Sequence, residues 1–168
     1  MSFDHQAFSD STSLDSVASV NKPEQDRALF VGLKYESYYQ AQFEKITPKK
    51  QYAGFNIAAF FLGVVWLFYR KMYSYGFMAI GLIVVIGMVE IILGIESSGA
   101  NIGLAVAFGM FGNTLYKHHV DQQITKIRQL GSGSVNTELE KRGGTNLIVG
   151  SILLVIWLGL VALAISAS

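Results

Sequence analysis

The chain has 168 residues, of which 51% are hydrophobic and 15% are charged, with a formal net charge of +1 and no cysteine. This apolar balance is unusual for a soluble domain and predicts an integral membrane protein. The lack of cysteine excludes disulfides and thiolate metal sites. The charge, with no dense basic face, gives no reason to expect a nucleic-acid partner, so the lipid bilayer is the expected one.

The N-terminal part of the chain is polar. Residues 1–23 are rich in Ser and Asp and lack the pattern of a cleavable signal peptide, so they are predicted to form a disordered tail. Residues 24–47 carry apolar side chains at spacings near three and four, which predicts an amphipathic helix ending before Pro48. The stripe consists of Val31, Tyr35, Tyr38, Tyr39, Phe43 and Ile46. A position at the lipid headgroups and a position packed on the rest of the protein explain it equally well.

Residues 53–69 are apolar on every helical face and should enter the bilayer, although their length is marginal for crossing it. The distribution of the 13 Lys and Arg residues distinguishes a crossing from a dip that returns. A crossing puts six of them on one side (Lys22, Arg27, Lys34, Lys45, Lys49, Lys50) and seven on the other (Arg70, Lys71, Lys117, Lys126, Arg128, Lys141, Arg142). A re-entrant segment keeps all of them on one face, as the positive-inside rule requires, so we favour it over a fourth span.

Three further segments are predicted to cross the membrane, at residues 76–95, 99–116 and 145–167. The polar residues 117–144 are predicted to form a cytoplasmic helical loop. The predicted fold is therefore an all-α integral membrane protein with three transmembrane helices, a preceding re-entrant or fourth spanning apolar helix, and an N-terminal amphipathic helix.

The loop at 117–144 carries its own helical signals. Val120, Ile124, Ile127 and Leu130 form a stripe that extends the helix of the preceding span out of the membrane. Thr137 and Glu140 have the spacing of a capping box, and Thr145 is expected to cap the last span.

Several motifs resemble those of a known family. They are Tyr38-Tyr39 with Phe43, Phe55-Asn56-Ile57-Ala58-Ala59-Phe60, Trp66, and Tyr69-Arg70-Lys71-Met72-Tyr73. Together they are similar to the signature of the domain of unknown function 2628 family over roughly residues 30 to 95, with a weaker echo at Gly143-Gly144-Thr145. The resemblance implies a small bacterial inner-membrane protein. It implies no shared activity, and so no catalytic residue or cofactor.

The motif residues have structural interpretations. Asn56 lies at helical spacing with small residues, and its amide should hydrogen-bond across a helix interface or to backbone freed where the segment turns, because burial in hydrocarbon is costly otherwise. Trp66 and Tyr69, with Tyr73, are expected to form an aromatic belt, from which Arg70 and Lys71 reach phosphate headgroups.

Small residues recur in the segment 99–116. Gly103 belongs to one row of small residues, and Asn113 to a second that includes Gly109. Two faces of this helix are therefore expected to accept close neighbours, within the chain or in a homo-oligomer.

Glu90 is the one ionisable residue well inside a predicted span. An intramembrane acid indicates an ion or proton path by default, with Asn101 or Asn113 as neighbours. The alternative is that Glu90 is neutral or reaches the nearby interface.

His118, His119 and Asp121 resemble metal ligands, but adjacent histidines point about 100° apart on a helix, so no metal site is expected. No catalytic motif accompanies them. We therefore predict a non-enzymatic membrane protein that acts through protein or lipid interactions. A small ion or proton-coupled transporter or channel using Glu90 is the alternative.

Overall fold

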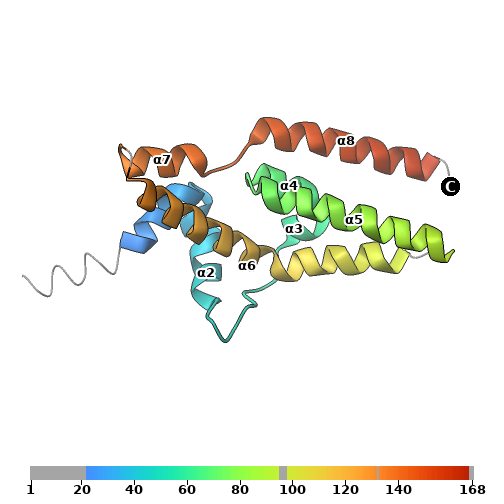
Figure 1. Ribbon diagram of the computed structural model, residues 1–168, viewed down its shortest axis with the longest axis horizontal. Coiled ribbons are helices and arrows are strands. Elements are labelled where there is room, and N and C mark those ends of the chain that lie inside the picture. The colour runs from blue at the N-terminus through green and yellow to red at the C-terminus, as the bar shows by residue number, and fades with distance from the viewer. Residues whose placement is uncertain (1–21, 95–97, 132, 167–168) are drawn as a thin grey trace, which may run out of the picture.

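The computed structural model describes residues 22–94, 98–131 and 133–166, and the expected tail at 1–23 falls outside them except for its last two residues. Within the described residues every regular element is a helix, apart from one isolated bridge between Thr47 and Lys50 beside the Pro48 turn. Figure 1 shows long helices running side by side over one end of the molecule and shorter helices gathered at the other end.

The N-terminal segment is not the single amphipathic helix expected over 24–47. A first helix covers residues 22–31, and a π-helical turn η1 (Tyr35–Tyr39) and α2 (Gln40–Lys45) follow it. The break lies at Gly32, whose φ of 76° is in the left-handed region that glycine adopts without a steric cost. Val31, Tyr35, Tyr39 and Phe43 are buried in the hydrophobic core. Their side chains therefore lie inside the protein, as in the packed alternative.

The apolar segment 53–69 forms two short helices, α3 (Ile57–Leu62) and α4 (Val64–Tyr69). Asn56 starts α3, where its side-chain oxygen accepts a hydrogen bond from Ala59 N at 2.9 Å, as an N-cap residue does. Gly63 separates the helices with φ 45° and ψ −111°. This positive φ suits glycine and lets the chain change direction.

The two short helices form a hairpin whose ends lie beside the same part of α6 (Ser98–Leu130). At its start, Asn56 N donates to Gly109 O at 2.7 Å. At its end, Arg70 Nη1 donates to the Tyr116 hydroxyl at 3.5 Å, two helical turns further along α6. Between them, Gly63 lies against Phe108. The chain thus enters beside Gly109, turns at Gly63 near Phe108 and ends beside Tyr116, and residues 56–70 are called the hairpin below.

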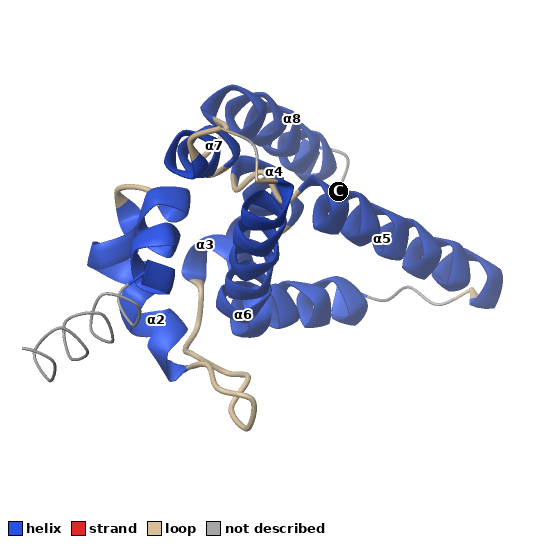
Figure 2. Ribbon diagram, turned by 60° about the vertical axis from the view of Figure 1, so that its left-hand side comes forward, coloured by secondary structure: helices blue, strands red, loops and turns tan. Residues whose placement is uncertain are grey.

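The remaining helices are α5 (Tyr73–Leu93), α7 (Val135–Arg142) and α8 (Leu147–Ser166). The hairpin lies among the long helices: α3 packs on α6, and α4 packs on both α5 and α8, whereas none of α5, α6 and α8 packs extensively on another. Figures 1 and 2 show the hairpin inside this arrangement. The short helices at the other end are called the head, which comprises residues 22–45, 117–130 and α7.

Two helices of the described residues, α5 and α8, are long and apolar enough to cross a bilayer. The second such stretch runs from Val135 to Leu163, but it includes the polar helix α7 and the bend after it, so its apolar part is α8. Large side chains on both helices are exposed, for example Ile91 at 82% and Ile148 at 75%. The segment 99–116, expected as a third span, is the first half of α6.

The helical stripe beyond residue 116 lies in one continuous helix. Val120, Ile124 and Ile127 are buried, whereas Leu130, at the last residue of α6, is 61% exposed. The two expected caps are wrong. Thr137 lies inside α7, which begins after Ser134, and the oxygen that accepts from Val149 N at the start of α8 belongs to Asn146. The Asn146 side chain also donates to the Tyr73 hydroxyl at 3.0 Å, so the same residue caps α8 and contacts the first residue of α5.

The contact between α3 and α6 depends on a glycine. A Cβ added to Gly112 meets Ala59 Cβ at 2.8 Å, whereas one added to Gly103 in the same helix has no neighbour within 4 Å. We expect Gly112→Ala to lower the free energy of unfolding by about 1 to 3 kcal/mol, the usual range for overpacking, because the Ala59 methyl has no rotamer with which to yield. Gly103→Ala should cause no loss. Thermal unfolding in detergent measures both, and equal effects would contradict the contact.

Candidate functional site

Arg70 occupies the junction between the hairpin and the head. It follows α4 directly, is only 6% exposed, and donates from Nη2 to the Tyr39 hydroxyl at 2.9 Å. Its guanidinium also lies over the rings of Tyr39 and Tyr116, at 4.6 and 4.9 Å from their centroids. Cation–π contacts of this kind gain strength when the cation is removed from water. The expectation that Arg70 reaches lipid headgroups is therefore wrong.

The guanidinium is held by aromatic rings and hydroxyls. No ion pair to Arg70 occurs among the described residues, and its Nε is buried without a hydrogen-bond partner. Burial raises the pKa of Tyr39, while the Arg70 charge and hydrogen bonds from Arg70 and Asn56 oppose this rise. The phenol therefore stays protonated at neutral pH and offers a neutral oxygen to the cation.

Asn56 and Asn113 extend this polar group along the interface between α3 and α6. Asn56 Nδ2 donates to Asn113 Oδ1 at 2.9 Å, and both residues are buried. Asn113 Nδ2 lies 3.3 Å from the Tyr38 hydroxyl and 3.4 Å from Gly54 O. Asn113 is thus the interhelical partner expected for Asn56. Tyr38, which bonds to Asn113 and packs edge-on against Tyr39 with ring centroids 4.9 Å apart, connects the two amides to the Arg70 site.

The other motif residues have structural contacts. Trp66 is 2% exposed and its ring centroid lies 6.0 Å from that of Tyr116, so it belongs to the core and not to an aromatic belt. Tyr69 packs against Gly150 of α8, and its carbonyl accepts from Asn146 N at 2.8 Å.

The Lys71 ammonium bonds within the protein, so the expectation that it reaches lipid headgroups is wrong. The φ of Lys71, 58°, is the one positive value among the described non-glycine residues. Its ammonium donates to the carbonyl oxygens of Lys141 and Gly143 at 3.1 and 2.5 Å, which are near the end of α7. Lys71 thereby ties the hairpin to the segment that leads into α8.

Glu90 and Gly103 stand apart from this network. Glu90 Oε1 is buried and has no hydrogen-bond partner. Asn113, one of its expected neighbours, is bonded to Asn56 instead. Gly103 is exposed, so the row of small residues that packs within the chain is the one containing Gly109.

The residues that resembled metal ligands, His118, His119 and Asp121, lie in different surroundings. His119 is buried and contacts the rings of Phe30 and Tyr75, and burial, with a smaller contribution from Lys126, lowers its pKa to about 4. It is therefore uncharged at neutral pH. His118 is exposed and pairs with Gln122. Among the described residues no group of three or more His, Cys, Asp or Glu could hold a metal ion.

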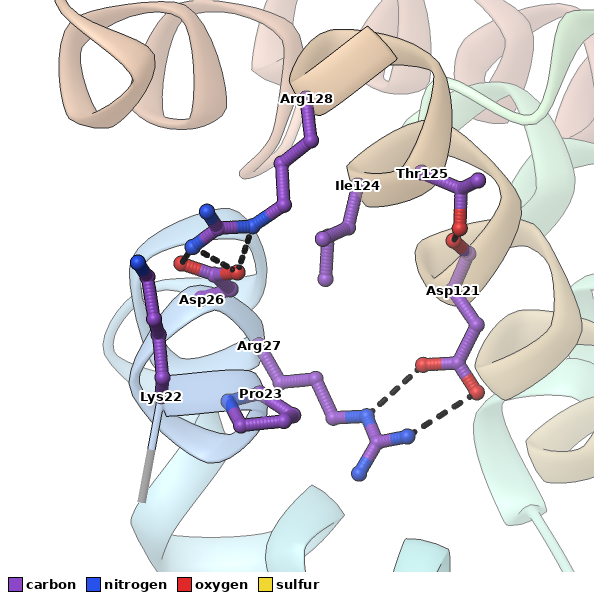
Figure 3. A pocket seen from close by; sticks show the side chains of 8 residues that line it. All are labelled: Lys22, Pro23, Asp26, Arg27, Asp121, Ile124, Thr125 and Arg128. Atoms are coloured by element: carbon purple, nitrogen blue, oxygen red, sulfur yellow. Dashed lines mark hydrogen bonds and ion pairs between the residues drawn. The ribbon is translucent and has the colours of Figure 1, made fainter. Parts of the chain in front are cut away.

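Asp121 belongs to a pair of charged contacts that fix the first helix to α6. Arg27 reaches its two carboxylate oxygens at 2.7 and 3.2 Å. Arg128 reaches those of Asp26 at 2.6 and 2.7 Å, so each helix supplies one acid and one arginine. These contacts border a cleft of about 540 Å³, in which Figure 3 shows both pairs with their charged groups facing each other.

Tyr39 and Tyr116 were not expected from the sequence as partners of Arg70. The sequence indicates these partners only in part. A buried arginine needs hydrogen-bond acceptors, and Tyr39 and Tyr116 lie in two segments that were expected to be helical. The pairing between residues 31 and 46 positions apart in the chain depends on the fold of the hairpin.

Comparison with known families is consistent with the motifs. The model of the family described as Protein of unknown function (DUF2628) matches residues 19–122, and the chain belongs to this family. The matched region contains the first helix, the hairpin, α5 and most of α6, and therefore every residue of the Arg70 network. No curated protein and no solved structure matches the chain.

The hydrogen bond between Arg70 and Tyr39 can be tested by removing the hydroxyl oxygen of Tyr39. Tyr39→Phe keeps the ring under the guanidinium but removes the acceptor, which leaves a buried cationic N–H unpaired. We expect the free energy of unfolding to fall by about 1.5 to 3 kcal/mol, the range for bonds to charged groups. Tyr52→Phe is the matched control, since Tyr52 is 43% exposed. Thermal unfolding of the two variants in the same detergent is the measurement, and equal midpoints would refute the role of this bond.

Proposed function

We propose that the chain is a non-enzymatic multi-pass protein of the bacterial inner membrane that acts through protein or lipid interactions, with its head on the cytoplasmic side. One observation carries the proposal: the molecule divides into an end whose large apolar side chains are exposed and a polar end whose apolar side chains are buried in a core shared with the hairpin. Apolar surface of this extent on α5 and α8 is stable in hydrocarbon and unfavourable in water. A folded head held at the membrane surface is suited to binding.

The proposed topology has three spans and one re-entrant hairpin. α5, the first half of α6 and α8 cross the bilayer, and the hairpin enters from the side of the head and returns to it. In support, Figure 1 shows the head at one end of these helices, and the end of α8 at the opposite end. The chain order then puts all 13 Lys and Arg residues on the side of the head, as the positive-inside rule requires for the cytoplasm.

The alternative function is transport of an ion or proton through Glu90. It is favoured by a specific observation, because a buried carboxylate oxygen without a donor is costly and is usually retained for a reason. A single acid in a span is nevertheless a sparse basis for coupled transport, so the binding function is preferred.

The topology predicts which positions a membrane-impermeant thiol reagent can reach, and the absence of native cysteine makes any introduced thiol unique. In intact cells with a permeabilised outer membrane, Ser74→Cys and Gln129→Cys should resist labelling, because both lie on the cytoplasmic side. Both side chains are exposed in the protein, so protein burial would not explain protection. Ser98→Cys should react. Four full crossings with a cytoplasmic N-terminus would reverse this pattern at every position.

Transport can be separated from binding by Glu90→Gln, which has nearly the same size and removes the charge. We expect parent and variant in sealed proteoliposomes to show the same proton and cation flux as protein-free vesicles. Parent flux above that level, abolished by the substitution while insertion is unchanged, would establish transport and reject the proposed binding function.

A further inference from the structure

An apolar chamber of about 600 Å³ lies beneath the tip of the hairpin. Its walls come from the hairpin tip at Gly63, from Ile83 of α5, from Leu104 and Ala105 of α6, and from Trp157 of α8. The chamber therefore touches all three long helices, and apart from Asn101 its lining is apolar. This volume falls within the range of small-molecule binding pockets in proteins, about 300 to 1,000 Å³.

The chamber exists because the hairpin is short. Along α6, at 1.5 Å per residue, Phe108 beside the hairpin tip is roughly 12 Å from Tyr116, and a bilayer core is roughly 30 Å thick. The hairpin therefore fills only the half next to the head. In the other half the three helices have no central element to pack on, and they do not pack extensively on one another. Something else must fill that space, because an apolar void in a protein forfeits its packing contacts.

A second polar group, Glu90, lies beyond the end of the chamber away from the head and is not one of its lining residues. Asn101 lines the chamber, and Glu90 lies two turns beyond Ile83 on the same side of α5, where Ile86 and Gly87 are also only partly exposed. The rings of Tyr75 and His119 are in contact, and at 1.5 Å per residue Glu90 is roughly 22 Å from Tyr75 along α5 and Asn101 roughly 27 Å from His119 along α6, so their depths differ by about 5 Å. Glu90 Oε1 is buried with no donor.

We propose that this chamber holds a hydrocarbon chain of a phospholipid from the leaflet opposite the head, and that the lipid's primary amine bonds to Glu90. This inference rests on the proposed membrane placement. An acyl chain has the chemistry of the apolar lining. A primary ammonium group supplies the opposite charge and the N–H donor that the buried carboxylate oxygen lacks, and such charge-assisted bonds are the strong ones.

Two common phospholipids provide a matched comparison. Phosphatidylethanolamine and phosphatidylcholine both carry a cationic headgroup, but only ethanolamine has N–H donors. Trp157 lines the chamber, so its fluorescence responds to a molecule bound there, whereas Trp66 is 2% exposed and lies in the core. Lipids brominated on their acyl chains quench tryptophan on contact, and the Trp157→Phe variant gives the contribution of Trp66.

The protein is reconstituted in mixed bilayers in which either the ethanolamine lipid or the choline lipid is brominated, at equal mole fraction. We expect several-fold preferential quenching of Trp157 by the ethanolamine lipid, and loss of this preference in Glu90→Gln. Ala105→Phe fills the chamber and should also remove the preference, whereas Val106→Phe, at an exposed neighbouring position, should keep it. If Ala105→Phe does not fold, Leu104→Phe serves the same purpose.

Equal quenching by the two lipids in the parent protein would overturn the amine assignment, and a preference that survives filling of the chamber would overturn the site. A preference that disappears as the ratio of protein to lipid rises would show a second copy of the chain in the chamber, and would also overturn the proposal. Absence of quenching by either lipid would instead contradict the membrane placement on which the proposal rests.

Discussion

The structure depends on the burial of one cation. Arg70 ends the hairpin, and its guanidinium lies over the rings of Tyr39 and Tyr116, which come from η1 and α6 and contact each other. Placing a cation in a protein interior costs several kcal/mol unless other groups replace its water. Two ring faces and two hydroxyls do this here, and arginine suits the position because its planar group both stacks and donates in several directions. The same contact joins the hairpin, the head and α6.

The tight packing of the hairpin follows from small residues placed opposite it. Gly109 and Gly112 of α6 lie under Phe55 and Ala59, and Gly150 of α8 lies under Tyr69. In hydrocarbon such close approach is a main source of helix association, since burial of apolar surface gains little there. The buried Asn56 to Asn113 hydrogen bond fixes the register between α3 and α6, because a shifted hairpin would leave both amides unpaired.

Helical class and the long apolar helices follow from local sequence, because periodicity acts within a few residues, whereas the break at Gly63 was not predicted. Asn56 was recognisable from local sequence as well, since an amide in an apolar segment needs a partner. The positions of Arg70, Lys71 and Trp66 were not, because a cation or an aromatic ring near a membrane edge has the same local pattern whether it faces lipid or protein. The break at Gly32 is a local effect that the helical periodicity of residues 24–47 concealed, whereas the bonds of Lys71 to the end of α7 depend on residues distant in the chain.

The head is built from pieces that lie on both sides of the membrane segments in the chain. Arg27 and Asp121 are 94 residues apart, and Asp26 and Arg128 are 102 residues apart. During synthesis the aromatic side of residues 22–45 therefore emerges long before its partner surface on α6, which follows the hairpin and α5. In the proposed topology the apolar segments insert before α6 is complete, and until then Tyr35 and Phe43 remain without their final contacts. In the same topology, the charged contacts of the head can form only after residues 117–130 of α6 have reached the side of the bilayer that holds residues 22–45.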